Sequence, residues 1–228
     1  MNIQENYKNV MDGMKNACEK SGRNIEDVTL IAVTKFVPIE RIAPLVELGV
    51  RHVGENRVQE LLSKQSFFEE SGCSMHLIGQ LQTNKVKYIV GSVELIQSVD
   101  RLSLAVEIEK QAEKRGVVQN ILVQVNIGEE MQKGGADTAE VMALLSAIEE
   151  MPHIKAQGLM CIPPAVDQEA ARPYFRHMRE LYLTCKEKYG QAFKHLSMGM
   201  SGDFEVAIEE GATMVRVGSA LFGARDYH

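Results

Sequence analysis

The sequence predicts an α/β protein built as a single (β/α)8 TIM barrel that is preceded by an extra N-terminal helix. Short β-branched segments alternate with amphipathic segments along nearly the whole chain, as in a parallel sheet covered by helices. Eight such segments occur in 228 residues, which fits the strand count of a closed barrel and its usual size of about 250 residues. No G-x-G-x-x-G motif follows the first strand, which removes the main support for the alternative, an open doubly wound sheet.

The predicted elements follow in order along the chain. A first helix over residues 4–20 carries Tyr7, Val10 and Met14 on one side, the spacing of an amphipathic helix. Several of the strands after it are near-continuous apolar runs, as parallel strands covered on both faces require. The predicted strands are 29–35, 52–56, 75–79, 95–99, 121–127, 154–160, 195–201 and 214–219.

Capping residues and one proline indicate where helices begin and end. Asp137 precedes a helical stretch in the manner of a capping box. Gly190 follows an apolar stripe that begins at Tyr174, as a glycine does when it ends a helix. Pro44 lies inside the helical segment 38–48, where it predicts either a kink or a late helix start.

Composition limits the class of protein. Asp and Glu number 31 against 25 Lys and Arg, a formal net charge of −6, which argues against a general nucleic-acid binder with a basic face. No apolar run approaches the ~18 residues of a membrane span, and the N-terminus lacks the apolar part of a secretory signal. The four cysteines form no C-x-x-C pair and are expected to be reduced. We therefore expect residues 1–228 to form one cytoplasmic, monomeric domain with no nucleic-acid or membrane partner.

A lysine stands where a barrel carries its function, at the carboxyl end of a strand. Lys35 ends the first predicted strand directly after an apolar run. By position alone it is an ordinary solvated lysine. Amine chemistry becomes a reasonable interpretation only if other groups hold a carbonyl compound beside it.

The last two strands supply such groups. The seventh runs into a glycine-rich turn that contains Ser201, and the eighth ends in a turn with Gly218 and Ser219. Small residues at strand-to-helix turns direct backbone N–H groups at an anion, and barrels frequently bind phosphate in these two loops. Each loop alone could be an ordinary glycine turn, with Ser201 capping a helix. Their joint position predicts a phosphate site.

Arg216 adds a third group. Strand alternation places it on the same face as Met214 and Gly218, directed into the upper barrel. A buried guanidinium needs acceptors, and these could come from an internal ion pair with Glu55 or from a ring nitrogen of a bound cofactor. A strand-end lysine, a phosphate cup and an arginine beside a ring together match what pyridoxal 5′-phosphate (PLP) requires.

Two polar residues of the middle strands are also candidates. Asn56 follows the second strand, where its amide could hydrogen-bond a ring substituent. His76, in the third strand, is expected to be a core histidine with satisfied hydrogen bonds. The six histidines show no H-E-x-x-H or other metal spacing, so we expect no metal site. No G-x-S-x-G motif is present either, so nucleophilic hydrolysis has no support.

Seven segments carry a specific resemblance to a known family. They are AVTKF (32–36), GENRVQE (54–60), HLIGQLQTNK (76–85), VNIGEEMQKGG (125–135), GLMCIPP (158–164), LSMGMSGDFEVAIEEG (196–211) and VRVGSALFG (215–223). In this order they closely resemble the PLP homeostasis protein family, the YggS/PROSC-type PLP-binding proteins. The resemblance implies the barrel of the alanine racemase N-terminal domain, with a PLP fold type III-like site. It also implies a protein for vitamin B6 homeostasis, not an established enzyme.

The resemblance implies roles for single residues. Lys35 matches the lysine that forms a Schiff base with PLP, and Asn56 matches a residue near the PLP hydroxyl. Arg216 matches the arginine that faces the pyridine nitrogen, and Met198 falls where a side chain packs beside the ring. The matching residues of the phosphate cup are Ser201, Gly218 and Ser219. No catalytic residue is implied.

The choice between a carrier and an enzyme depends on Arg216. A fixed cation beside the ring nitrogen disfavours its protonation, because adjacent positive charges repel, and the neutral ring is a poor electron sink. This favours a carrier that delivers PLP to apoenzymes over a PLP-dependent amino-acid racemase. The chain is also expected to lack the C-terminal β domain and tyrosine base of the racemases, since only Tyr227 follows the eighth strand. A barrel that binds another phosphorylated metabolite is a third interpretation.

Overall fold

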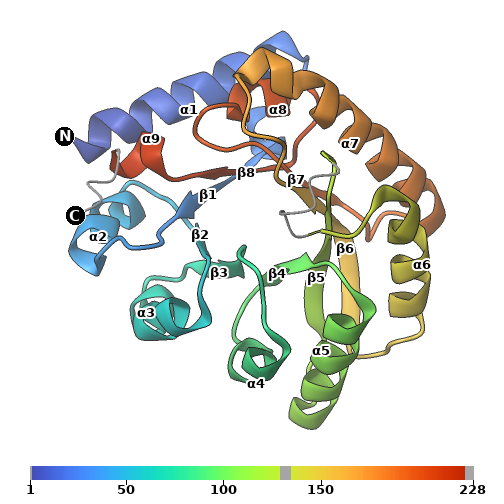
Figure 1. Ribbon diagram of the computed structural model, residues 1–228. Helices are drawn as coiled ribbons and strands as arrows, with labels where there is room; N and C mark the ends of the chain where they lie inside the picture. The colour runs from blue at the N-terminus through green and yellow to red at the C-terminus, as the bar shows by residue number, and fades with distance from the viewer. Residues whose placement is uncertain (1, 129–134, 224–228) are drawn as a thin grey trace.

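Eight parallel strands close into a barrel in chain order in the computed structural model, which describes residues 2–128 and 135–223 (Figure 1). Pairing of β1 with β8, in which Ala32 lies beside Val217, closes the ring. The strands are β1 (Thr29–Val33), β2 (His52–Glu55), β3 (Ser74–Leu77), β4 (Leu95–Val99), β5 (Gln119–Val125), β6 (Ile154–Cys161), β7 (His195–Ser197) and β8 (Met214–Val217). The predicted (β/α)8 barrel is confirmed.

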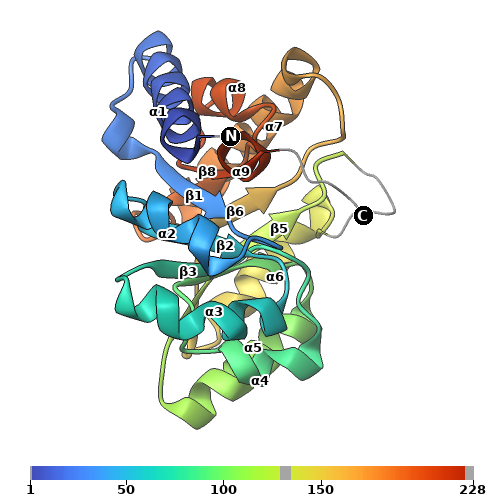
Figure 2. The same ribbon diagram turned by 90° about the vertical axis from the view of Figure 1, so that its left-hand side faces the viewer.

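Helices surround the barrel (Figure 2). The predicted N-terminal helix is confirmed as α1 (Ile3–Lys20), which packs against α8 and α9. The other helices are α2 (Ile39–Glu47), α3 (Val58–Glu70), α4 (Val86–Ile89), α5 (Leu102–Arg115), α6 (Thr138–Glu149), α7 (Gln168–Tyr189), α8 (Phe204–Glu209) and α9 (Ser219–Phe222), with short 3-10 turns at Ile25–Asp27 and Thr83–Lys85. Within the described ranges, no helix combines the length and apolar character that a bilayer crossing needs.

Strand alternation separates the apolar side chains into two layers. Inside the barrel a small cluster contains Ile31, Leu95, Leu122, Met160 and Met214. A much larger cluster fills the space between the strands and the helices. The four cysteines are buried and unpaired.

The last two strands end earlier than the sequence predicts. β7 ends at Ser197 and β8 at Val217, because the chain turns out of the sheet at the glycines that follow. Gly199 has a φ of +93°, a left-handed conformation that favours glycine. The residues beyond each strand end are therefore loop residues, which is what a binding cup at this end of the barrel requires.

Helix ends agree with the sequence in part. α2 begins at Ile39 and contains Pro44, so the late start considered for this helix is wrong. Gly190 ends α7, as predicted. Asp137 is the N-cap residue of α6, but its side chain forms no capping hydrogen bond with the described residues, so the predicted capping box is wrong.

Candidate cofactor-binding site

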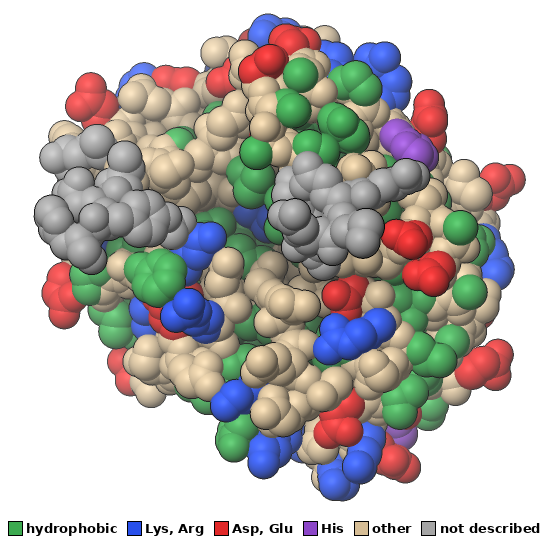
Figure 3. Space-filling model, viewed as in Figure 1, with side chains coloured by type: hydrophobic (Ala, Val, Ile, Leu, Met, Phe, Trp, Pro, Cys, Tyr) green, Lys and Arg blue, Asp and Glu red, His purple; other side chains and the backbone are tan. Residues whose placement is uncertain are grey.

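The carboxyl ends of the strands face the viewer in Figures 1 and 3. A hollow lies near the middle of this face, and atoms of basic side chains are visible inside it (Figure 3). The candidate residues of the sequence analysis belong to the ends of β1, β2, β7 and β8, which meet at this face.

Ser201 joins the loops that follow β7 and β8. Its hydroxyl oxygen accepts hydrogen bonds from the backbone N–H groups of Gly218, at 3.0 Å, and Ala220, at 3.2 Å. The interpretation in which Ser201 caps α8 is wrong, since the N-cap residue of that helix is Asp203. Ser219 lies exposed between the two donors. These two N–H groups occupy the acceptor side of the Ser201 hydroxyl, which fixes it between the two loops and leaves its own proton to donate to an oxyanion.

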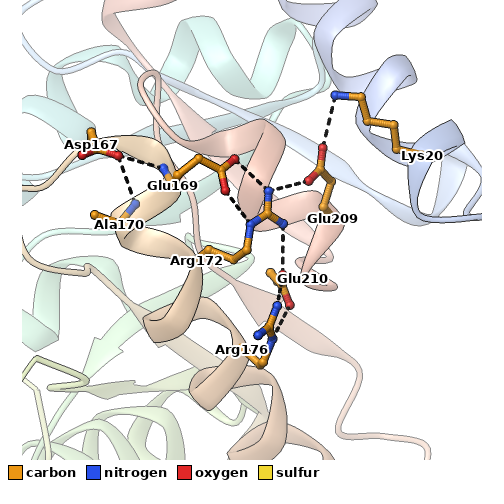
Figure 4. A network of polar contacts seen from close by, with 8 residues as sticks. All are labelled: Lys20, Asp167, Glu169, Ala170, Arg172, Arg176, Glu209 and Glu210. Atoms are coloured by element: carbon orange, nitrogen blue, oxygen red, sulfur yellow. Dashed lines mark hydrogen bonds and ion pairs between the residues drawn. The ribbon is translucent and has the colours of Figure 1, made fainter.

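Ion pairs hold the C-terminal end of α8, the helix that follows the Ser201 loop (Figure 4). Arg172 of α7 contacts Glu209 at 2.8 Å and Glu210 at 3.0 Å. Lys20 of α1 reaches Glu209 from the other side, at 3.4 Å. Three hydrogen-bonded carboxylates, the third from Glu169, raise the pKa of Arg172 above its usual value. The network joins α1 and α7 to the end of α8.

Lys35 lies in the turn after β1, two residues beyond the strand end, and is half-buried. The position of a Cβ on Gly218 would be 3.3 Å from Cβ of Val33. The β8 turn therefore packs directly on the end of β1. This contact brings the Lys35 turn and the Ser201 loop to the same part of the barrel face.

A buried lysine fixes the peptide that precedes Lys35. The ammonium group of Lys64, on α3, donates to the carbonyl oxygen of Thr34 at 2.8 Å and to Glu55 Oε1 at 2.8 Å. The Thr34 hydroxyl donates to the same carboxylate oxygen at 2.6 Å. Burial raises the pKa of Glu55, and the hydrogen bonds from Lys64 and Thr34 oppose that rise. We call Thr34, Glu55 and Lys64 the Lys35 clamp.

The turn continues through a backbone conformation that needs support. Phe36 has a φ of +60°, an unfavourable region for a bulky residue. Its backbone N–H donates to the Glu60 carboxylate, whose Oε1 also lies 3.1 Å from Lys64 Nζ. Arg57 lies over the Phe36 ring, 5.2 Å from its centroid. The contacts from α3 and its N-cap residue Arg57 stabilise the conformation that follows Lys35.

Arg216 points into the barrel, as the alternation of β8 predicts. Its side chain is 3% exposed and donates from Nη1 to Ser197 Oγ at 2.6 Å and from Nη2 to the Cys161 carbonyl at 2.7 Å. The predicted alternative, an ion pair with Glu55, is wrong because Glu55 is in the Lys35 clamp. Burial lowers the pKa of Arg216. With the part of the chain that the structure describes, these bonds use two of the five guanidinium donors, which leaves others for a ligand.

The structure brings Asn56 to the same face but not Met198. Asn56 follows β2 and is half-buried, and a Cβ on Gly79 would be 2.3 Å from its carbonyl oxygen, so Gly79 permits this close approach. Met198 belongs to the outer apolar cluster, while its neighbour Ser197 faces the barrel interior. The described residues thus bring Lys35, Asn56, Ser201, Arg216, Gly218 and Ser219 to one face.

His76 is a fully buried core histidine with both ring nitrogens hydrogen-bonded, as predicted. Burial lowers its pKa to about 3. In residues 2–128 and 135–223, no group of three or more His, Cys, Asp or Glu could hold a metal ion.

The family model of the alanine racemase N-terminal domain matches residues 3–226. The chain belongs to this family. The pyridoxal phosphate homeostasis protein of Aquifex aeolicus is 47% identical over 228 residues, 100% of each chain. PipY of Synechococcus elongatus, solved with PLP bound, is 32% identical with a TM-score of 0.80, over 92% of this chain and 100% of that chain. An alanine racemase of Clostridium difficile has the same fold, with a TM-score of 0.72 at 17% identity, over 98% of this chain and 56% of that chain.

This member of the alanine racemase N-terminal domain family fits PLP at the observed site. The Ser201 hydroxyl, fixed by the N–H group of Gly218, can donate to a phosphate, and the buried guanidinium of Arg216 can donate to a ring nitrogen. The supporting roles of Lys64 and Ser197 are not predicted by the sequence. No pattern indicates Lys64, because a helical lysine is usually exposed. Ser197 could have been found by asking which residue of β7 faces Arg216 across the strand pair. Tyr227 lies outside the described residues.

Proposed function

We propose that this chain binds PLP and serves PLP (vitamin B6) homeostasis as a cytoplasmic, monomeric carrier, with residues 1–228 acting as one PLP-binding domain. The main support is the Ser201 hydroxyl, which the N–H groups of Gly218 and Ala220 fix beside the turn that carries Lys35. The Aquifex aeolicus relative, a pyridoxal phosphate homeostasis protein, and the PLP-bound PipY support the same ligand. Apoenzymes that accept PLP are the proposed partners.

Each residue of the site has a defined part in holding the ligand. PLP supplies an aldehyde that condenses with a primary amine and a ring that withdraws electrons. The Lys35 amine bonds to the aldehyde carbon with loss of water, which gives a Schiff base. Arg216 donates to the pyridine nitrogen and Asn56 contacts the ring hydroxyl. The phosphate is held by Ser201, Gly218 and Ser219.

Borohydride reduction tests the covalent link. We expect reduction of the PLP-loaded protein to add the pyridoxyl mass to the peptide that contains Lys35, because this lysine lies in the turn after β1, beside the proposed phosphate cup. Lys35→Ala should lose the adduct yet retain noncovalent PLP, since the cup is unchanged. Peptide mass mapping measures both results. Modification of Lys85 instead, with Lys35 unmodified, would contradict the assignment.

The phosphate cup is tested by hydroxyl removal. Ser201→Ala and Ser219→Ala should each weaken PLP binding by about 0.5–1.5 kcal/mol, or somewhat more if the bond is charge-assisted, because the backbone donors stay in place. Pyridoxal, which lacks the phosphate, should bind much more weakly than PLP. Fluorescence titration measures these affinities. The matched control is Ser103→Ala, which removes a hydroxyl from an exposed serine of α5. Equal affinities for pyridoxal and PLP would remove the cup from the proposal.

Exchange at the amino-acid Cα separates the carrier from a racemase. Arg216 disfavours protonation of the ring nitrogen, and inversion needs an acid or base on each face of Cα. Two buried groups on the barrel strands are unsuited to that role, since burial raises the pKa of the Cys161 thiol to about 12 and lowers that of His76 to about 3. PLP-loaded protein in deuterated water should therefore exchange and racemise single-enantiomer alanine far more slowly than about 1 s⁻¹, an ordinary enzymic rate. Chiral chromatography and mass spectrometry measure it, and turnover at that rate would establish the racemase instead.

A further inference from the structure

Polar side chains cross the interior of the barrel in an unbroken series of hydrogen bonds. Arg216 Nη1 lies 2.6 Å from Ser197 Oγ, and that oxygen lies 2.7 Å from Gln97 Oε1. Gln97 Nε2 lies 3.2 Å from His76 Nδ1. His76 Nε2 lies 3.0 Å from His52 Nδ1. The series runs from β8 through β7, β4 and β3 to β2, and we call these five side chains the barrel column.

The column connects the two ends of the barrel. Arg216 is 3% exposed, and the next three members are fully buried. His52 is the first residue of β2 and is half-buried. It lines a cavity of about 330 Å³ between the amino end of the barrel and α1, together with Tyr7 and Met14. Water can thus reach one end of the column, whereas the proposed PLP site lies at the other end.

The donors of the column all point in one direction. A guanidinium has no acceptor, so Ser197 Oγ accepts from Arg216 and directs its own proton at Gln97 Oε1. The Gln97 amide group donates to His76 Nδ1, and Met214 Sδ, 3.9 Å away, supports this orientation of the amide. A neutral His76 that accepts at Nδ1 carries its proton on Nε2, and so donates to His52 Nδ1.

We propose that Gln97, His76 and His52 are positioning residues for Arg216, and that the proton state of His52 sets how firmly Arg216 is held for the ring nitrogen of PLP. The purpose assigned to Arg216 rests on the proposed function. The column itself rests on the four hydrogen bonds alone and can be tested without PLP.

A proton on His52 Nδ1 disturbs the whole column. Two N–H groups then face each other between His52 and His76, unless every bond reverses. Reversal turns the Gln97 amide, so that Ser197 Oγ accepts from both Gln97 and Arg216 while its own proton leaves the column. Either outcome loses a buried hydrogen bond, which is costly in the low dielectric of a core. Neutral His52 is therefore the state that holds Arg216 in its observed position.

The charges around His52 decide when it takes up a proton. Burial lowers its pKa, and Glu94, which precedes β4, opposes that effect. His76 and His195 face it from β3 and β7. Two further charged residues, Glu26 and Arg51, line the same cavity. His76 faces no charged partner besides His52 and His195 among the described residues.

Nuclear magnetic resonance of the PLP-free protein tests the column directly. In the protein labelled with ¹⁵N, His76 and His52 should both carry their proton on Nε2 at pH 8. On acidification, the Nε signal of Arg216, assigned with Arg216→Lys, should shift with the same midpoint as the His52 ring signals. The proposal would be overturned if His76 carried its proton on Nδ1, or if the Arg216 Nε signal did not shift while His52 titrates.

Two substitutions at His52 separate a positioning role from a packing role. His52→Asn keeps an acceptor for His76 but cannot titrate, so the His76 tautomer should persist and the pH-dependent shift of Arg216 should vanish. His52→Leu removes the acceptor and should raise the PLP dissociation constant about twofold to tenfold, the loss of one ordinary hydrogen bond. His52→Asn should recover most of that loss. His177→Gln, on the exposed side of α7, is the control and should leave the Arg216 signal unchanged.

The outcomes distinguish this inference from the proposed function. If the protein binds no PLP but shows the two tautomers and the coupled shift, the function is wrong and the column stands. If PLP binds and both His52 variants weaken it equally with no change at Arg216, the column is wrong and the carrier stands.

Discussion

Replacing Lys64 with methionine is expected to destabilise the protein by about 3–5 kcal/mol, the loss measured when one partner of a buried ion pair is removed. The Lys64 side chain is 8% exposed and that of Glu55 is 1% exposed. Without the ammonium group, the Glu55 carboxylate remains in the core with the Thr34 hydroxyl as its donor. Its second oxygen, Oε2, has no hydrogen-bond partner among the described residues even in the intact protein. The Thr34 carbonyl oxygen also loses its donor from Lys64.

The defect should depend on pH in a defined direction. Burial already raises the pKa of Glu55, and loss of Lys64 removes the hydrogen bond that opposes this rise. A raised carboxyl pKa means that the folded chain binds more protons than the unfolded chain, so stability falls as pH rises. Urea unfolding should therefore show a larger difference between Lys64→Met and wild type at pH 8 than at pH 5.

An exposed ion pair provides the control. Lys8 and Asp12 lie 2.6 Å apart on α1 with side chains 73% and 55% exposed, and solvent screens such pairs. Lys8→Met should change stability little at either pH. If Lys64→Met lowers the free energy of unfolding no more than Lys8→Met does, the Lys35 clamp contributes no more to stability than a surface ion pair. Slower trapping of PLP on Lys35 in Lys64→Met would show that the clamp also positions the lysine.

The alternation of apolar segments and helices was sufficient to predict the barrel, because that pattern has few stable solutions. Residues at strand ends could be predicted as well, since parallel strands bring their carboxyl ends to one face. This is why Lys35, Ser201 and Gly218, far apart in the sequence, were correctly expected at the same end of the barrel. The precise ends of β7 and β8 could not be predicted, because β-propensity continues into turns whose direction depends on glycine conformation.

Contacts across the barrel interior, and contacts between a strand and the helix outside it, could not be predicted from the sequence. The partner of Arg216 depends on which residues of neighbouring strands face inward at the same height, and a shift of the register by one residue changes the answer. Glu55 was therefore a reasonable expectation, yet alternation directs its side chain outward to Lys64. The direction of the Met198 side chain was unpredictable for the same reason: it lies in the outer apolar cluster, while its neighbour Ser197 occupies the inward position. Gln97 and His52 carry no sequence signal for the barrel column.

Acid should destabilise the protein through His76, and His76→Gln should remove this effect. The folded-state pKa of His76 is about 3, against about 6.5 for an unperturbed histidine. Between these values the unfolded chain binds a proton that the folded chain does not. The free energy of unfolding therefore falls as pH decreases below about 6.5. The loss is about 1.4 kcal/mol per pH unit for this one group, or roughly 3 kcal/mol between pH 6 and pH 4.

Glutamine is the informative replacement, because it can accept from Gln97 and donate to His52 without titrating. Urea unfolding at pH 7, 6, 5 and 4 gives the free energy of unfolding as a function of pH. The slope of this plot should be shallower for His76→Gln than for wild type by the amount that one proton contributes. The raised pKa values of Glu55 and Asp203 act in the opposite direction but are common to both proteins and cancel in the difference. Ser197→Ala is the matched control, since it breaks the same column without removing a titratable group and should keep the wild-type slope. Equal slopes for wild type and His76→Gln would mean that His76 is protonated as easily in the folded chain as in the unfolded one, and the neutral column would then be wrong.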